Sequence, residues 1–126
     1  MLDDAMPRED ISKQINPKLV AMFKSAEWKE RKKAADKVEE ILKAANMRIQ
    51  PVGLNELMDN MKLRMVDPNK AVLKSYLQLI GIVVQALGSS AKQYAKKLLP
   101  YVLQNLADKA TLVRQDTVAV MDIWSE

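Results

Sequence analysis

One pattern of apolar residues occurs three times along the 126-residue chain, at a spacing of about 41 residues. Each copy holds two runs in which apolar residues recur every three or four positions, separated by a short polar turn. The pattern predicts three pairs of helices, each pair packing its apolar face against the next. The matching positions of the first helix are Ile15, Leu19 and Phe23, then Leu57, Met61 and Met65, then Leu98, Val102 and Leu106.

Helix pairs that repeat every 40–47 residues or so are typical of HEAT and armadillo proteins, which stack such pairs into a solenoid. We therefore predict an all-α fold, a HEAT-repeat α-solenoid with three antiparallel helix pairs. The repeats are expected at about 15–46, 54–88 and 89–126, within a partial HEAT domain that covers residues 10–126. Residues 1–9 are expected to be a linker or terminal extension. No polar capping repeat is visible at the end, so we expect further repeats in a longer array.

Capping residues suggest where the helices begin. Asn16 and Pro17 predict a helix from 17 to about 24, with Asn16 as its N-cap. Asp67 and Pro68 likewise predict a cap and a first turn, and the helix that follows, at about 68–87, is apolar nearly all round and should be central. Further helices are expected at about 28–45, 54–65, 91–107 (bent at Pro100 and capped by residues 88–90) and 110–124.

The composition argues against an enzyme. The chain has no Cys and no His, and therefore lacks disulfides, thiolate metal ligands and the commonest general base. Its three glycines are isolated, so no phosphate-binding loop is present. We expect no enzymatic activity, no metal and no cofactor. The longest apolar run, residues 79–84, is too short to span a membrane. A reducing compartment fits the absence of Cys.

The charge of the chain favours an acidic partner. The net charge is +4, and residues 1–10 are acidic, so the positive charge lies in the remainder. A basic body suits an acidic protein surface or nucleic acid, although solubility alone would also explain a charge of this size. Nucleic acid is disfavoured because the basic residues alternate with Glu and Asp, and because Trp28 is the one exposed aromatic side chain expected for base stacking.

The turns inside the three repeats are the candidate binding surface, because equivalent turns of stacked helix pairs lie in a row on one edge. Trp28 is the strongest candidate, since an exposed Trp is a common hot spot, although it could instead fold back over its own turn. Surface lysines in the later turns are often only solvated. The candidate residues are Trp28, Lys29, Asn69, Lys70, Lys109 and Thr111.

Other conspicuous residues are interpreted as structural. Arg31 and Arg114 occupy equivalent positions just after a turn and are expected to tie that turn together. Methionines at helical spacing can form adaptable binding surfaces, but here they align with core positions of the other copies. Met58, Met61 and Met65 are therefore assigned to the core. Trp124 is also assigned to the core, because it follows Val120, Met121 and Ile123 in a helix with a core-like pattern.

The turn residues resemble those of TOG domains, which are HEAT-repeat modules of the ch-TOG and Dis type of microtubule polymerases. The resemblance covers about residues 7–124. It is carried by Glu27-Trp28-Lys29-Glu30-Arg31-Lys32, by Asp67-Pro68-Asn69-Lys70, and by Asp108-Lys109 followed by Val113-Arg114. Residues 7–12 and 120–124 are similar to the fourth TOG domain of the long arrays, in particular that of plant members, with this chain as its N-terminal half.

The resemblance implies a paddle-shaped module that binds the αβ-tubulin heterodimer through its intra-repeat turns. Trp28 would then be the anchor, with basic and polar residues of the later turns around it. A TOG domain has six repeats, so the remaining repeats would be partners of this chain. The implied setting is the cytoplasm and the microtubule cytoskeleton, where the module would regulate microtubule growth and organisation. The alternative is a structural HEAT scaffold that binds another acidic protein or orients neighbouring domains without contacting tubulin.

Overall fold

The computed structural model describes residues 7–105, and within this range the chain is all-α, as predicted. An isolated β-bridge pairs Glu9 with Ile49. The last expected helix, at 110–124, lies outside the described residues, as do Lys109, Thr111, Arg114 and Trp124. The described α-helices are α2 (Pro17–Phe23), α3 (Trp28–Ala44), α4 (Asn55–Arg64), α5 (Lys70–Leu87) and α6 (Ala95–Gln104), with 3₁₀ helices η1 (Ser12–Gln14) and η2 (Gly88–Tyr94).

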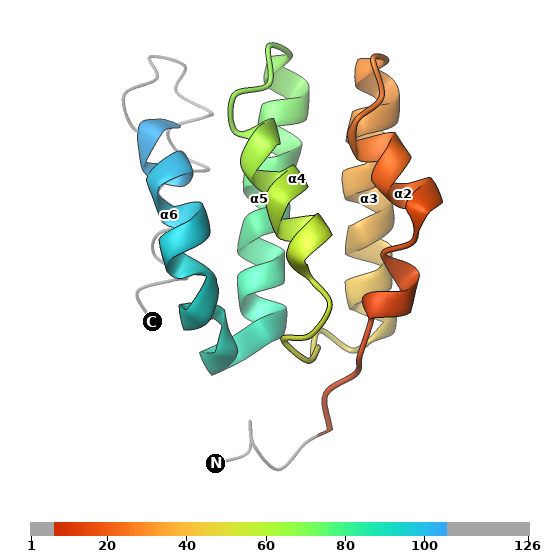
Figure 1. Ribbon diagram of the computed structural model, residues 1–126, viewed down its shortest axis with the longest axis vertical. Coiled ribbons are helices and arrows are strands. Elements are labelled where there is room, and N and C mark those ends of the chain that lie inside the picture. The colour runs from red at the N-terminus through yellow and green to blue at the C-terminus, as the bar shows by residue number, and fades with distance from the viewer. Residues whose placement is uncertain (1–6, 106–126) are drawn as a thin grey trace.

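The helices form two layers, as HEAT-like stacking requires. Helices α2, α4 and α6 lie side by side in one layer, and α3 and α5 lie behind them (Figure 1). Helix α3 packs against α5, and α4 packs against α6, so each repeat buries its apolar face on the next. The turns inside the first and second repeats lie on the same edge, at the top of Figure 1, and the loop between these repeats lies at the opposite edge.

Helix α5 is the central helix, as its apolar sequence predicted. Most of its side chains are buried, among them Tyr76, whose ring meets Phe23 of α2 edge to face. The stretch Lys70–Gln104 is long and apolar enough to cross a membrane by length and composition, but 61% of its most apolar window is buried inside the fold. Such burial is typical of a core helix.

The methionines of α4 and its C-cap, Met58, Met61 and Met65, lie in the same core, as predicted.

The predicted start of α5 was wrong by two residues. Helix α5 begins at Lys70, and its N-cap is Asn69, whose Oδ1 accepts hydrogen bonds from the N–H groups of Ala71 (2.9 Å) and Val72 (3.2 Å). Asp67 and Pro68 therefore lie before the helix. Both Asp and Asn are good N-caps. In the structure Asn69 caps α5, while the Asp67 carboxylate accepts hydrogen bonds from two arginines and from the N–H of Asn69.

The third repeat begins differently from the single bent helix expected at 91–107. Residues 88–94 form the 3₁₀ helix η2, and α6 starts only at Ala95, with Tyr94 as an N-cap whose side chain makes no capping hydrogen bond. The serines at 89 and 90 therefore do not cap α6. Gly88 ends α5 with a φ of 61° and a ψ of −135°, a conformation that glycine adopts much more readily than other residues. Helix α6 continues through Pro100.

Ordered contacts at the N-terminus begin before residue 10. The Arg8 guanidinium donates to the carbonyl of Ala86 at 2.8 Å. The backbone of Glu9 exchanges hydrogen bonds with the loop between α3 and α4, at Arg48 (3.0 Å) and Gln50 (2.8 Å). Residues 8 and 9, which the sequence placed in a linker, therefore contact the loop between the first two repeats and the end of α5.

Candidate functional site

The candidate surface is the edge that carries the turns between α2 and α3 and between α4 and α5, which we call the turn edge (Figure 1). The structure brings four of the six predicted site residues to this edge. Trp28 and Lys29 open α3, and Asn69 and Lys70 open α5. The other two predicted residues, Lys109 and Thr111, fall outside the described range.

Trp28 is an exposed aromatic side chain on the first turn. It is the first residue of α3, and 39% of its surface remains accessible. The ammonium of Lys29 lies 5.8 Å from the centroid of the indole ring, which is within the range of a cation–π contact. The turn before it is closed by a hydrogen bond from the Glu27 N–H to Ser25 Oγ (3.1 Å). The result is a large amphipathic ring presented on an ordered turn.

The buried side chain of Arg31 stabilises this turn through hydrogen bonds to its backbone. The Arg31 guanidinium donates from Nη1 to the carbonyls of Ser25 (2.9 Å) and Ala26 (3.1 Å), which lie in the turn itself. It also donates from Nε and Nη2 to the two carboxylate oxygens of Asp67, at 2.8 and 3.1 Å. Arg31 thus has the structural role expected from its position, and in addition it ties the first turn to the second.

Asp67 is the shared acceptor of both turns. Besides Arg31, it accepts from Nη1 of Arg64 at 2.8 Å and from the N–H of Asn69 at 2.9 Å. Burial opposes ionisation, but the hydrogen bonds from Arg31 and Asn69 and the charges of both arginines outweigh it and hold the pKa of Asp67 below its usual value. The carboxylate is therefore charged at neutral pH, and its charge is neutralised beneath the edge.

A tyrosine from the central helix completes this network. The hydroxyl of Tyr76 donates to the Arg31 carbonyl at 2.7 Å, from 45 residues further along the chain. Burial raises the pKa of Tyr76 well above its ordinary value, so the hydroxyl keeps its proton and remains a donor. The first turn of α3, the turn before α5 and the middle of α5 are thereby held in one hydrogen-bonded unit, which we call the Arg31–Asp67 network.

The second turn presents side chains that the sequence interpretation only partly identified. Asn69 uses its Oδ1 to cap α5, while Lys70 is exposed at the start of that helix. Val66 is 67% exposed and was not predicted as a site residue. The repeat pattern did contain a signal for Val66. This residue aligns with Lys24 and Ala107, outside the core positions of the pattern, so it is an apolar residue at a non-core position.

Within residues 7–105, no group of three or more His, Cys, Asp or Glu side chains is placed to hold a metal ion. The carboxylate with the most partners, Asp67, is committed to arginines. What the turn edge offers is an exposed indole, exposed ammonium groups and an exposed valine above a fixed support. These are features of a surface that contacts another macromolecule.

No protein-family model matches the chain. It is homologous to a segment of much longer proteins. It is 40% identical over 121 residues to the protein MOR1 of Arabidopsis thaliana and 36% identical over 121 residues to the protein MOR1 of Oryza sativa, matching 96% of this chain in each case. It is 35% identical over 118 residues, 93% of this chain, to Centrosomal protein 224 of Dictyostelium discoideum. The chain spans 6% of the length of each of these relatives.

Proposed function

We propose that the chain is the N-terminal half of a TOG-like HEAT module, corresponding to the fourth TOG domain of a long array, which binds αβ-tubulin through the turn edge. Through this contact the longer protein would regulate microtubule growth and organisation. The observation that carries the proposal is the exposed Trp28 on a turn held by the Arg31–Asp67 network. The homologous segments in MOR1 and in a protein named for the centrosome support it.

The network explains why such an edge would bind without reorganising. The two turns are ordered before any partner arrives, because Arg31 fixes both of them through its hydrogen bonds. A surface that is already in its binding conformation avoids the entropy cost of ordering loops on association. Trp28 has only two side-chain torsions to fix, and the cation–π contact with Lys29 restricts them further.

The charge of the second turn favours an acidic partner. Asp67 is buried and neutralised by Arg31 and Arg64, while Lys70 is exposed at the same turn. The acidic group is thus withdrawn from the surface, and the basic group remains on it. Val66 adds an exposed apolar contact beside them. A partner with an acidic surface and a recess for the indole would match this arrangement.

Size-exclusion co-elution of the full chain with αβ-tubulin, at low and moderate salt, tests the proposal. The variant Trp28→Glu removes the anchor, and Val52→Glu makes the same kind of change on the loop at the opposite edge, where Val52 is 42% exposed. We expect co-elution for the wild type and for Val52→Glu, and its loss for Trp28→Glu with unchanged far-ultraviolet circular dichroism. Absence of co-elution for the wild type, or its survival in Trp28→Glu, would refute the proposed function.

A further inference from the structure

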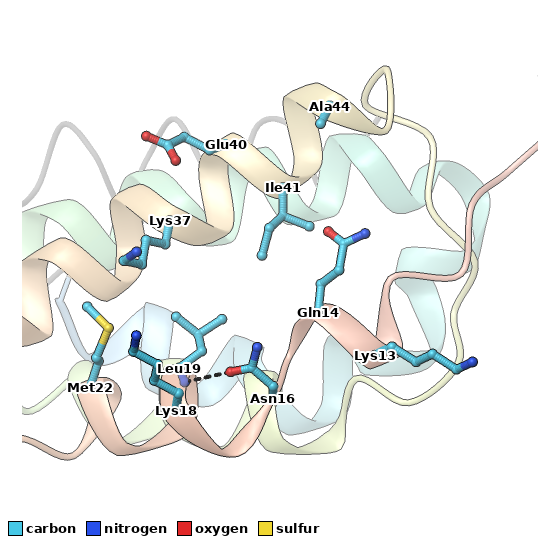
Figure 2. A pocket seen from close by; sticks show the side chains of 10 residues that line it. All are labelled: Lys13, Gln14, Asn16, Lys18, Leu19, Met22, Lys37, Glu40, Ile41 and Ala44. Carbon is cyan, nitrogen blue, oxygen red and sulfur yellow. Dashed lines mark hydrogen bonds between the residues drawn. The ribbon is translucent and has the colours of Figure 1, made fainter.

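A second surface of the chain is hollowed, between α2 and α3. A cavity of about 510 Å³ lies between η1 and α2 on one side and the C-terminal half of α3 on the other (Figure 2). It follows from helix length. Helix α2 has 7 residues and α3 has 17, or about 10 and 25 Å at 1.5 Å per residue. The short helix cannot cover the far half of its partner, and η1 fills only part of the gap.

The floor of this groove is apolar. Leu19 of α2 and Ile41 of α3 point toward one another across the hollow, and Met22 lies beside Leu19 (Figure 2). Leu19 is buried, whereas Met22 and Ile41 are only partly covered by the fold. An apolar side chain placed in the hollow would remove the exposed parts of Met22 and Ile41 from water, which favours binding in proportion to the area buried.

The rim of the groove is basic. Lys13, Lys18 and Lys37 line it, against a single acidic residue, Glu40. Within the part of the chain that the structure describes, no ion pair involves any of these three lysines. Lysines elsewhere do have acidic partners, such as Lys97 with Asp59 at 2.6 Å. The groove thus combines an apolar floor with a rim of net positive charge.

We propose that this groove binds a short acidic, amphipathic peptide segment of a partner protein. Large apolar side chains of the peptide would occupy the hollow against Leu19, Met22 and Ile41, and its carboxylates would lie beside the three lysines. Helices with an apolar face commonly bind proteins in grooves of this kind. The groove is lined by α2 and by the C-terminal half of α3, and its lining includes neither Trp28 and Lys29 nor Asn69 and Lys70, so a peptide there would leave these residues accessible.

Fluorescence anisotropy with the full chain and no tubulin tests this inference. The probe is a fluorescein-labelled amphipathic peptide of glutamate and leucine at helical spacing, with two control peptides in which serine replaces the leucines or lysine replaces the glutamates. The double variant Lys18→Glu/Lys37→Glu reverses two rim charges. Its matched control is Lys24→Glu/Lys33→Glu, which changes two exposed lysines of the same helix pair outside the groove.

We expect saturable binding of the glutamate–leucine peptide alone, weakened at least about tenfold by Lys18→Glu/Lys37→Glu and little changed by the control. Methyl NMR should show shifts at Leu19, Met22 and Ile41. Absence of binding by the wild type, equal losses in both double variants, or shifts confined to the turn edge would overturn the proposal. So would self-association of the chain that Lys18→Glu/Lys37→Glu abolishes, because the groove would then belong to a second copy.

Discussion

Replacing Asp67 by Asn should destabilise the fold more than any conservative change on its surface. The side chain of Asp67 is fully buried and accepts four hydrogen bonds, three of them from arginine guanidinium groups. Asp67→Asn keeps the shape, so no cavity forms, but it removes the charge and turns one acceptor into a donor. Arg31 is then left largely buried without its counter-charge.

The size of the effect follows from the cost of breaking a buried ion pair on one side, which is about 3–5 kcal/mol. The total stability of a domain is about 5–15 kcal/mol, so Asp67→Asn should remove a large share of it. Urea unfolding followed by circular dichroism measures the difference. The midpoint should fall while the slope with denaturant stays the same, because the surface exposed on unfolding is unchanged.

The matched control is Asp59→Asn. Asp59 pairs with Lys97 at 2.6 Å, but both side chains are substantially exposed. Pairs of this kind contribute about 1 kcal/mol or less, so Asp59→Asn should change the midpoint only slightly. A loss below about 1 kcal/mol for Asp67→Asn, or equal losses in the two variants, would refute the claim that the Arg31–Asp67 network holds the turn edge.

Two further predictions concern the second turn, and a third concerns the loop at the opposite edge. The pKa of Asp67 is lowered in the folded state, so the charged carboxylate stabilises the fold fully above the unfolded-state pKa of about 3.9. This stabilisation is lost as the pH falls through the folded-state pKa. The stability difference between wild type and Asp67→Asn should therefore be constant near neutral pH and shrink in acid unfolding curves recorded below about pH 4. Asn69→Ala should cost about 1 kcal/mol in urea unfolding, because it removes the cap of α5; an unchanged midpoint would contradict that role. Gly53→Ala should lower the thermal midpoint, with a cost of about 1–2 kcal/mol, because Gly53 has a φ of 63° and a Cβ there would collide with Ser12; a variant as stable as wild type would show that the loop can rearrange.

Local sequence patterns predicted most of the helices, for a physical reason. The repeat spacing and the alternation of apolar and charged residues depend on neighbours within a few positions, and they placed α2, α3 and α4 to within about one residue at each end. The same pattern identified α5 as the central helix and the methionines of α4 as core. It also placed Trp28 on an exposed turn, because that position in the other copies is not apolar.

Of the features that the sequence did not supply, two depend on how the helices pack and one is local. Asp67 was interpreted as a helix cap because an Asp before a Pro commonly has that role. Its actual partner, Arg31, is 36 residues away and meets it only when α3 packs against α5. The start of α6 was missed for a local reason, because Gly88, with a φ of 61°, leads into a 3₁₀ helix whose apolar residues fit either helix type. The groove depends on the unequal lengths of α2 and α3, and it becomes visible only once the two are packed.

The most direct test of the turn edge as the tubulin-binding surface is site-specific photo-crosslinking. A photoreactive amino acid would replace Val66, which is exposed on the second turn, and in a separate variant Val52, which is exposed on the opposite edge. Each variant is mixed with αβ-tubulin, irradiated and examined for a crosslinked product. The proposed function predicts a crosslink from position 66 that free wild-type chain competes away, and none from position 52. A crosslink from position 52, or none from position 66, would contradict it.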